Sequence, residues 1–340
     1  MAGYQPGEQP QTGKFIKLNT NENPYPPSPK VIQAIQAALE AGLAKYPDAV
    51  SDSFRTRAAE VLGVDPDWIL CGNGSDDILT IVTRAFVGES QLLRMPYPSY
   101  VLYRTLAGIQ AARYEELKFT PDWKLTSEFA APADSLRLAI LPNPNSPSGT
   151  IISADEILKI AEQLTCPLLI DEAYVDFAEE HCLELVRQSP RIMVSRTLSK
   201  SYALAGLRFG FLIAQPEIID QLMKVKDSYN CDALAIAGAT AAIDDQAWLQ
   251  ENRGKIIATR ERMAEQLGQL GFSVVPSQAN FLWCTHERLA LRPIYEELKS
   301  HRLLVRYMDY ADWGDGLRIS IGTDDQADAC VELLKLVLGH

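Results

Sequence analysis

Short apolar runs alternate with helical patterns along much of this chain, and that alternation limits the folds open to it. The runs cover residues 68–71, 91–95, 136–141, 167–171, 192–195 and 209–214. Short runs that are apolar throughout suit strands buried on both faces, and helical patterns such as those over 75–86 and 153–164 separate many of them. The chain is therefore predicted to form an α/β fold, with a mostly parallel central sheet and helices on both faces.

The pattern changes after about residue 215. Helical patterns fill 216–270, and short strands alternate with two further helices from 272 onward, which predicts a smaller α+β unit. We place the boundary inside a long helix near residue 250. The predicted organisation is an N-terminal arm over 1–27, a large domain over 28–250 and a small C-terminal domain over 251–340. The first helices, over 28–42 and 51–62, are assigned to the large domain, with packing against the small domain as the alternative.

Composition narrows the range of partners. The chain carries 32 Lys and Arg against 44 Asp and Glu, a net charge of −12, so it is a poor ligand for nucleic acid or anionic membranes. No apolar run approaches the roughly 18 residues that span a bilayer, and the polar residues 1–14 predict a loose arm instead of a secretory signal. The six cysteines lack metal-ligand spacing and are predicted to be buried free thiols. We expect a cytoplasmic protein with no metal site.

A lysine follows the buried run over 192–195. It lies in the string TLSKSYALAGLR, residues 197–208, at the edge of the sheet where open α/β folds bind ligands. Lysine forms Schiff bases with carbonyl groups. Two hydroxyls precede Lys200, and Arg208 follows it, which together suit a phosphate. A surface lysine in a Ser/Thr loop is the alternative for a bare SK pair, and the full string favours a site.

Four further motifs also follow predicted strands. Asp171 and Tyr174 lie in DEAY after 167–170, where a carboxylate can bind a protonated pyridine nitrogen or simply cap a helix. Gly72–Asp77 is a glycine turn before a helix, and the N–H groups of such a turn bind anions. Tyr100 in PYPSY suits stacking on a flat ring, and residues 142–149 (PNPNSPSG) offer an amide to a ring hydroxyl.

Taken in this order, these motifs resemble the fold-type-I aminotransferases, which depend on pyridoxal 5'-phosphate (PLP). The resemblance runs from about residue 17 to the end of the chain. It also includes Asn21–Pro26 (NENPYP), Lys45–Asp48 (KYPD) and Gly316–Thr323 (GLRISIGT). The lysine string and DEAY are specific to the superfamily, whereas NENPYP and GLRISIGT indicate a subgroup less sharply.

The resemblance implies a role for each matching residue. Lys200 forms the Schiff base with the cofactor and acts as the catalytic base. Asp171 pairs with the pyridinium nitrogen, and Tyr174 contacts the ring oxygen. Tyr100 stacks on the ring, and Tyr46 reaches the cofactor phosphate of the neighbouring subunit, so the active site requires a homodimer.

The remaining matches concern the cofactor phosphate and the substrate. The resemblance assigns the phosphate to Ser75, Asp76, Thr197, Ser199 and Arg208, and the substrate to Asn23, Tyr25, Arg306 and Arg318. One loop departs from the family, because NNPTG is replaced by Asn145-Ser146-Pro147-Ser148-Gly149. The ring-contacting amide is assigned to Asn145, with Ser146 at the family position as the alternative.

The closest resemblance is to members that act on histidinol phosphate. It implies transfer of the amino group from histidinol phosphate to 2-oxoglutarate, which gives imidazole acetol phosphate and glutamate in histidine biosynthesis. Two alternatives keep the fold and cofactor: an aminotransferase for aromatic or other amino acids, and a decarboxylase of threonine phosphate. A DNA-binding regulator is disfavoured because no basic patch occurs, and a dehydrogenase because no GxGxxG follows a strand.

Overall fold

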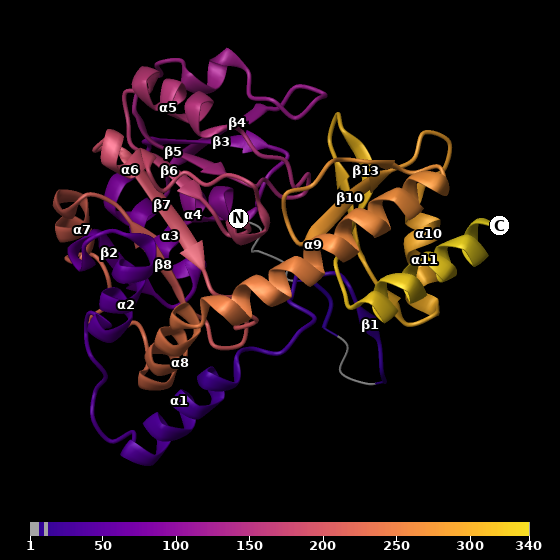
Figure 1. Cartoon of the computed structure of the whole chain (residues 1–340). Coiled ribbons are helices and arrows are strands. Elements are labelled where there is room, and N and C mark those ends of the chain that lie inside the picture. Colours follow the sequence, from indigo (N-terminus) through magenta and orange to yellow (C-terminus); the bar gives the residue numbers. More distant parts are fainter. Residues whose placement is uncertain (1–6, 10–12, 340) are drawn as a thin grey trace.

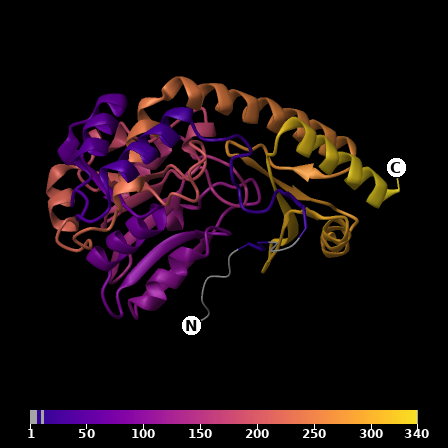
Figure 2. The same ribbon diagram turned by 90° about the horizontal axis from the view of Figure 1, so that it is seen from below.

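Two lobes joined by one long helix make up the structure (Figure 1). This computed structural model describes residues 7–9 and 13–339. The larger lobe is built on a seven-stranded sheet and the smaller one on a four-stranded sheet. The joining helix, α9 (Gln246–Gln269), runs along the molecule from one lobe to the other (Figure 2). The predicted boundary near residue 250 falls inside it.

The large sheet has the strand order β2-β8-β7-β6-β5-β3-β4, and all of its pairings are parallel except those of β8. The predicted mostly parallel sheet is thereby confirmed. The strands are β2 (Ile69–Gly72), β3 (Leu92–Tyr97), β4 (Arg113–Lys118), β5 (Leu136–Pro142), β6 (Leu168–Asp171), β7 (Ile192–Thr197) and β8 (Gly210–Ile213).

Helices cover both faces of this sheet, which explains why its central strands are apolar throughout. Successive residues of β6 belong to different hydrophobic cores, one on each face of the sheet. Leu169 belongs to the core that includes residues of α3, α4 and α7, and Ile170 belongs to the core that includes residues of α2, α5 and α8. The helices of this lobe are α1 (Pro29–Ala41), α2 (Asp52–Leu62), α3 (Ser75–Phe86), α4 (Leu102–Ile109), α5 (Ala154–Gln163), α6 (Leu185–Gln188), α7 (Pro216–Leu222) and α8 (Ala233–Asp244), with 3-10 turns at Pro66–Trp68, Ser127–Ala130 and Val175–Phe177.

The small lobe pairs its strands antiparallel in the order β12-β13-β10-β9. These strands are β9 (Ser273–Val274), β10 (Phe281–Thr285), β12 (Arg306–Tyr310) and β13 (Gly314–Ser320), packed with α9, α10 (Leu291–Ser300) and α11 (Asp324–Leu338). The arm adds β1 (Ile16–Lys17), which pairs in parallel with β11 (Leu303–Leu304). The arm is thus fastened to the small lobe, whereas α1 and α2 pack on α8 in the large lobe.

Most predicted elements are confirmed, and the exceptions have physical reasons. The side chain of Ser28 caps α1 by accepting from Lys30 N, and Gly42 ends it at φ 96°. The polar strand β4 (RYEELK) lies at the sheet edge, where its side chains face water, so it carried no apolar signal. Within the predicted apolar stripe of α1, Ile32 and Leu39 are 48% and 55% exposed.

The structure describes the predicted N-terminal arm only in part. Residues 1–6 and 10–12 of the predicted loose arm lie outside the described residues. In the described part Gly7 is buried, and the Glu8 carbonyl accepts a hydrogen bond from Asn19 Nδ2 at 2.9 Å, so this piece is held in place.

All six cysteines are free and buried, as predicted. Among the described helices we find none with the length and apolarity needed to cross a bilayer.

Candidate active site

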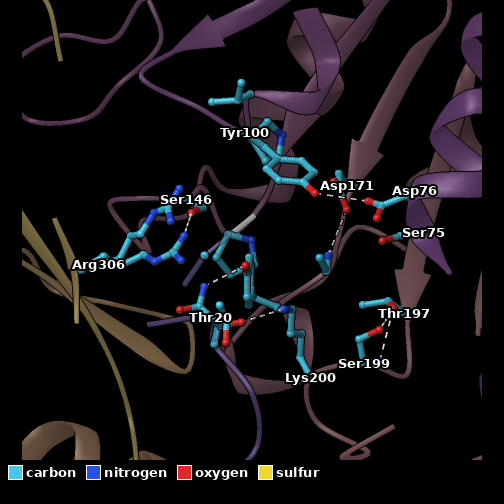
Figure 3. Close-up of a pocket in the computed structure, with 18 of the residues that line it drawn as sticks. Thr20, Ser75, Asp76, Tyr100, Ser146, Asp171, Thr197, Ser199, Lys200 and Arg306 are labelled. Carbon is cyan, nitrogen blue, oxygen red and sulfur yellow. Dashed lines mark hydrogen bonds between the residues drawn. The ribbon is translucent and has the colours of Figure 1, made fainter. Parts of the chain in front are cut away.

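A cavity of about 230 Å³ opens at the carboxyl ends of the parallel strands, and both lobes and the arm line it (Figure 3). This is the edge at which the sequence predicted a site. The cavity collects predicted residues that are far apart in the sequence. They are Ser75, Asp76, Tyr100, Asp171, Tyr174, Thr197, Ser199, Lys200, Arg208, Arg306 and Arg318.

Asp171 ends β6 in the middle of the sheet and is 5% exposed. Its Oδ2 accepts from Tyr103 Oη at 2.8 Å, and its Oδ1 accepts from Ser195 Oγ at 3.4 Å and from Ala173 N at 3.2 Å. Burial raises the pKa of Asp171 to about 6, and the nearby charge of Asp76 adds to the rise. Among the described residues its donors are neutral, so the carboxylate is buried without a cation.

Lys200 follows β7 and extends its amine into the cavity. Its Nζ donates to the carbonyl of Thr20 at 3.3 Å and lies 5.7 Å from the centre of the Tyr174 ring. No described carboxylate forms an ion pair with it. An amine without a fixed anionic partner can form a new bond with a carbonyl group without breaking an ion pair.

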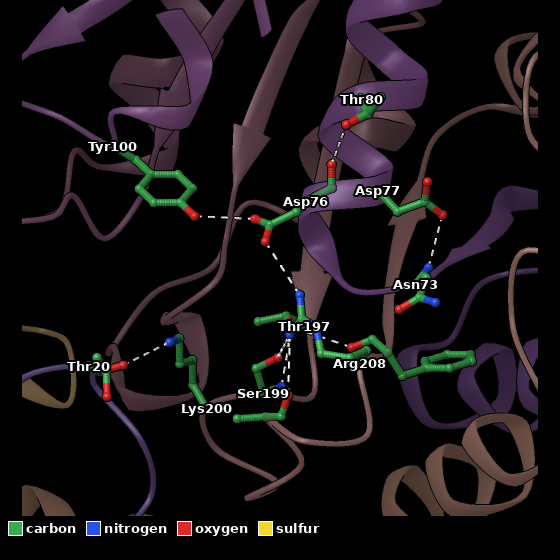
Figure 4. A network of polar contacts seen from close by, with 12 residues as sticks. Thr20, Asn73, Asp76, Asp77, Thr80, Tyr100, Thr197, Ser199, Lys200 and Arg208 are labelled. Carbon is green, nitrogen blue, oxygen red and sulfur yellow. Dashed lines mark hydrogen bonds and ion pairs between the residues drawn. The ribbon is translucent and has the colours of Figure 1, made fainter. Parts of the chain in front are cut away.

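One end of the cavity is formed by the start of α3 and the loop after β7 (Figure 4). Thr197 Oγ1 donates to Ser199 Oγ at 3.0 Å, and Arg208 Nη1 donates to the same oxygen at 3.3 Å. Arg208 Nη2 also lies 3.4 Å from Asp76 Oδ2, an ion pair that neutralises part of the site. Hydroxyls, a guanidinium and a helix N-terminus together suit an anion.

A glycine allows this end to form. A Cβ placed at Gly210 would lie 2.6 Å from Ser75 N and 2.7 Å from the carbonyl carbon of Gly74. Any larger residue at the start of β8 would therefore push the helix start away from the strand. The backbone N–H groups at the α3 terminus depend on this close approach for their position.

Arginines occupy the other end, where Arg306 faces the cluster of Ser75, Asp76, Thr197 and Ser199 across the cavity (Figure 3). Arg306 in β12 and Arg318 in β13 are direct cross-strand partners. Arg318 Nη1 donates to Ser146 Oγ at 2.9 Å, and its Nη2 donates to the Asn19 carbonyl at 3.1 Å. Its buried Nε has no hydrogen-bond partner among the described residues. Two adjacent guanidinium groups make a second anion site.

The departure in the 142–149 loop changes which side chain reaches the cavity. Ser146 lines it, and Asn145 does not. The Asn145 amide donates instead to the Pro98 carbonyl at 3.2 Å and to Ser148 Oγ at 2.9 Å, so it braces the loop from behind. Its Oδ1 is buried without a partner among the described residues. Ser146 therefore lies at the cavity wall with Asn145 behind it, and the assignment of the ring contact to Asn145 stays a prediction.

Three other predicted residues lie away from this cavity. Asn23 Nδ2 donates to the Ser201 carbonyl at 2.8 Å, and the ring of Tyr25 lies 5.1 Å from Lys255 Nζ. Tyr46 is 80% exposed and stacks on Tyr229 with ring centres 4.5 Å apart. A single chain therefore does not bring these three side chains to the site.

Sequence reasoning also missed residues that do line the cavity. Tyr103 lies in the first turn of α4, three residues after Tyr100, and the two rings meet edge to face with centres 5.6 Å apart, so this spacing was a usable signal. Thr20 directly precedes NENPYP and Asn21 is its first residue, but nothing in their types indicated contact with Lys200 or Tyr174. Met308 and Tyr310 follow Arg306 on alternate positions of β12, so they share its face.

Comparison with known proteins agrees with this geometry. Residues 13–334 match the family described as aminotransferase class I and II. The chain is 56% identical to a histidinol-phosphate aminotransferase of Rhodopirellula baltica, over 98% of this chain and 93% of that protein. It is 46% identical to one of Geotalea daltonii, over 98% and 96%.

A solved structure is also similar. The histidinol-phosphate aminotransferase of Sinorhizobium meliloti, solved in complex with pyridoxal-5'-phosphate, superposes with a TM-score of 0.89 at 27% identity, over 95% of this chain and 90% of that one. The sequence match covers nearly the whole chain, and the fold and the cavity agree with it. The chain therefore belongs to the class I and II aminotransferases.

Proposed function

We propose that this protein is a PLP-dependent enzyme that transfers the amino group of histidinol phosphate to 2-oxoglutarate. One observation carries the proposal: the amine of Lys200 lies in a cavity that has a buried carboxylate and two separate anion sites. A cofactor phosphate needs one anion site, and a phosphorylated substrate needs the other. Relatives up to 56% identical bear the name of this activity.

The residues present fit PLP. The cofactor has a cationic ring nitrogen and an anionic phosphate, and the cavity offers the counterpart of each. Asp171 is a buried carboxylate that lacks a cation among the described residues. The α3 terminus, with Arg208 beside it and Gly210 beneath it, makes a cradle for a phosphate. Lys200 would hold the cofactor covalently, and Tyr174 and Tyr100 would contact its ring.

The chemistry divides between cofactor and protein. When bound, the cofactor supplies a sink for the electron pair that is left on the substrate Cα when its proton departs. Lys200 Nζ would take that proton and return it at the neighbouring carbon, because an amine held at the reacting carbon can act as a general base and then as a general acid. Asp171 keeps the ring nitrogen protonated, since a buried carboxylate favours a cation beside it.

The second anion site supports a phosphorylated substrate. Arg306 and Arg318 lie together in a chain whose net charge is −12, so their positive charge is local. Arg318 would also bind the α-carboxylate of glutamate in the other half-reaction. An aminotransferase for aromatic amino acids would need only one such arginine. A decarboxylase of threonine phosphate would use the same pair, and product analysis distinguishes it.

We further propose that the enzyme works as a cytoplasmic homodimer. The described surface of α1 and the following loop exposes Ile32, Leu39, Leu43 and Tyr46. A contiguous row of exposed apolar side chains is typical of a protein contact. Tyr46 lies outside its own cavity, so it is available to the cofactor phosphate of a neighbouring subunit. A second copy of the chain would cover this row and complete both sites.

The central test replaces the proposed base. Lys200→Ala should lower turnover of histidinol phosphate by at least about 10²–10⁴-fold, because proton transfer loses its catalyst. Glutamate formation from 2-oxoglutarate measures the rate, and borohydride reduction followed by peptide mapping locates the cofactor. Lys159→Ala, which removes an exposed lysine of α5, is the matched control and should retain the wild-type rate. A cofactor adduct on another lysine would contradict the assignment.

Substrate assays of the wild-type enzyme distinguish the alternative functions. Release of CO₂ from threonine phosphate would favour the decarboxylase, and faster turnover of phenylalanine would favour the aromatic aminotransferase.

The second anion site can be tested by removing one guanidinium. Arg306→Gln should lower kcat/KM for histidinol phosphate by about 10–100-fold, because a hydrogen bond to a charged group is worth about 1.5–3 kcal/mol. The value for unphosphorylated histidinol should change little, and the ratio of the two substrates is the measurement. Arg292→Gln, outside the cavity, is the control. An equal loss for both substrates would show that Arg306 does not recognise the phosphate.

Asp171 should destabilise the cofactor-free protein above its pKa. Its folded pKa of about 6 exceeds the ordinary 3.8, so the folded state holds the extra proton between these values. The free energy of unfolding therefore falls as pH rises through this window, by about 3 kcal/mol at most. Asp171→Asn should raise the stability of the cofactor-free protein at pH 8 and less so at pH 5, as measured by urea unfolding.

The same variant should behave oppositely towards the cofactor. Asp171→Asn should bind PLP more weakly, because the cationic ring nitrogen loses its partner. Asp67→Asn, at an exposed carboxylate, controls for net charge and should change neither property. A lower stability of Asp171→Asn at pH 8 would mean that the carboxylate is stabilised by groups other than those seen.

The dimer is tested at its proposed interface. Leu39→Glu should convert a particle with the mass of two chains into single chains, because a carboxylate would be buried between two apolar surfaces. Sedimentation equilibrium measures the mass, and the cofactor dissociation constant should rise as Tyr46 is withdrawn. Leu336→Glu, at a leucine of α11 that is also exposed (67%, against 55% for Leu39), should leave both unchanged. A wild-type enzyme that is active as a single chain would refute the shared site.

A further inference from the structure

Three consecutive residues of the N-terminal arm, 19–21, each bind a different residue of the cavity. The carbonyl of the first accepts from Arg318 Nη2 at 3.1 Å, and the carbonyl of the second accepts from Lys200 Nζ at 3.3 Å. The side chain of the third, Asn21, donates from Nδ2 to Tyr174 Oη at 2.9 Å. Two of these bonds use backbone carbonyls, so only the contact of Asn21 depends on the type of side chain.

Asn21 is held from several directions. It is 1% exposed and adopts a left-handed backbone conformation with φ 55°, which asparagine tolerates better than most residues. Its N–H donates to Ser320 Oγ at 2.8 Å, and its carbonyl accepts from Asn280 Nδ2 at 3.0 Å. Ser320 Oγ in turn donates to Asn21 Oδ1 at 2.9 Å. The side chain therefore has little freedom to choose other partners.

These contacts fix which way the amide of Asn21 points. Ser320 Oγ already accepts from the backbone N–H of Asn21, and its own proton needs an acceptor, which Oδ1 provides. Reversing the amide would aim Nδ2 at Ser320 and leave that hydroxyl proton without an acceptor among the described residues. A buried unpaired donor costs about 1–3 kcal/mol. Nδ2 therefore faces Tyr174 and donates to it.

The direction of this bond decides what Tyr174 can do. A hydroxyl oxygen that accepts from Asn21 still has its own proton to donate. Tyr174 lines the cavity, and the bond from Asn21 leaves its O–H as a donor towards whatever the cavity holds. If the amide presented Oδ1 instead, the tyrosine would donate to the arm and offer only a lone pair to the cavity.

We propose that Asn21 is a positioning residue that keeps the Tyr174 hydroxyl as a hydrogen-bond donor towards the ring oxygen of the bound cofactor. This inference rests on the proposed function, because it needs PLP in the cavity. A donor at that oxygen favours its unprotonated form. The bond from Asn21 also polarises the tyrosine O–H and strengthens it as a donor. Asn21 acts through Tyr174 and does not itself touch the substrate.

The test measures a property of the resting holoenzyme in place of its rate. The visible absorbance of enzyme-bound PLP changes with pH, and the midpoint of that change reports protonation at the cofactor. Asn21→Ala should raise this midpoint by up to about one pH unit, because the Tyr174 hydroxyl loses the bond that orients and polarises it. Tyr174→Phe should raise it by at least as much. The midpoint of the double variant should be no higher than that of Tyr174→Phe, because Asn21 acts only through the Tyr174 hydroxyl.

Controls separate positioning from general loss of stability. Asn252→Ala removes another buried amide, on α9 away from the cavity, and should lower the unfolding temperature without moving the midpoint. If Asn21→Ala does not fold, Ser320→Ala is read in its place. That change frees the Asn21 amide to reverse, so the midpoint should rise in the same direction by a smaller amount.

The outcomes distinguish this inference from the proposed function. An unchanged midpoint in Asn21→Ala, or in Ser320→Ala where the former does not fold, overturns the positioning role while the wild-type spectrum still supports a PLP enzyme. Additive shifts in the double variant also overturn it. A wild-type protein that shows no visible band with PLP overturns the proposed function itself.

Discussion

The site depends on the alignment of parallel strands, whose carboxyl ends must all meet at one edge. Strands β5, β6 and β7 run side by side in the centre of the large sheet. The loops that follow them therefore deliver Ser146, Asp171 and Lys200 to one place, although the strands are separated by whole helices in the sequence. β8 alone runs against the others, and its reversal brings Gly210 beneath the start of α3. A different strand order would place these side chains at separate points along the sheet edge.

Charge at this edge is arranged at a cost to stability. The chain is acidic overall, yet four cationic side chains line one cavity: Lys200, Arg208, Arg306 and Arg318. Glu22, Asp76 and Asp171 supply the carboxylates of the same cavity, and Asp171 is buried at the end of β6 with neutral donors around it. Such a group raises the free energy of the empty protein and lowers that of the protein that holds a ring cation. The same desolvation that weakens the fold therefore makes the carboxylate a strong partner, a trade common at functional sites.

Sequence reasoning predicted the parts of this arrangement that are local. An apolar run followed by a reactive side chain places Lys200, Asp171 and Arg208 at the sheet edge without any knowledge of distant contacts. It did not reach the contacts that depend on residues distant in the sequence. Ser146 reaches the cavity while Asn145 braces the loop against Pro98, a choice made by the packing of two loops. Tyr46 is exposed and stacks on Tyr229, so no contact within its own chain places it at the cavity.

The arm shows the same limit most clearly. Asn21 and Tyr174 are 153 positions apart, and Asn21 and Ser320 are 299 apart. Their contact exists only when the arm, the large sheet and strand β13 of the small lobe are all in place. The direction in which the Tyr174 hydroxyl donates is thus set by three segments that are far apart in the sequence. This chain of hydrogen bonds couples the packing of the arm to the orientation of the Tyr174 hydroxyl in the cavity. Loss of any member would leave a buried polar group unpaired.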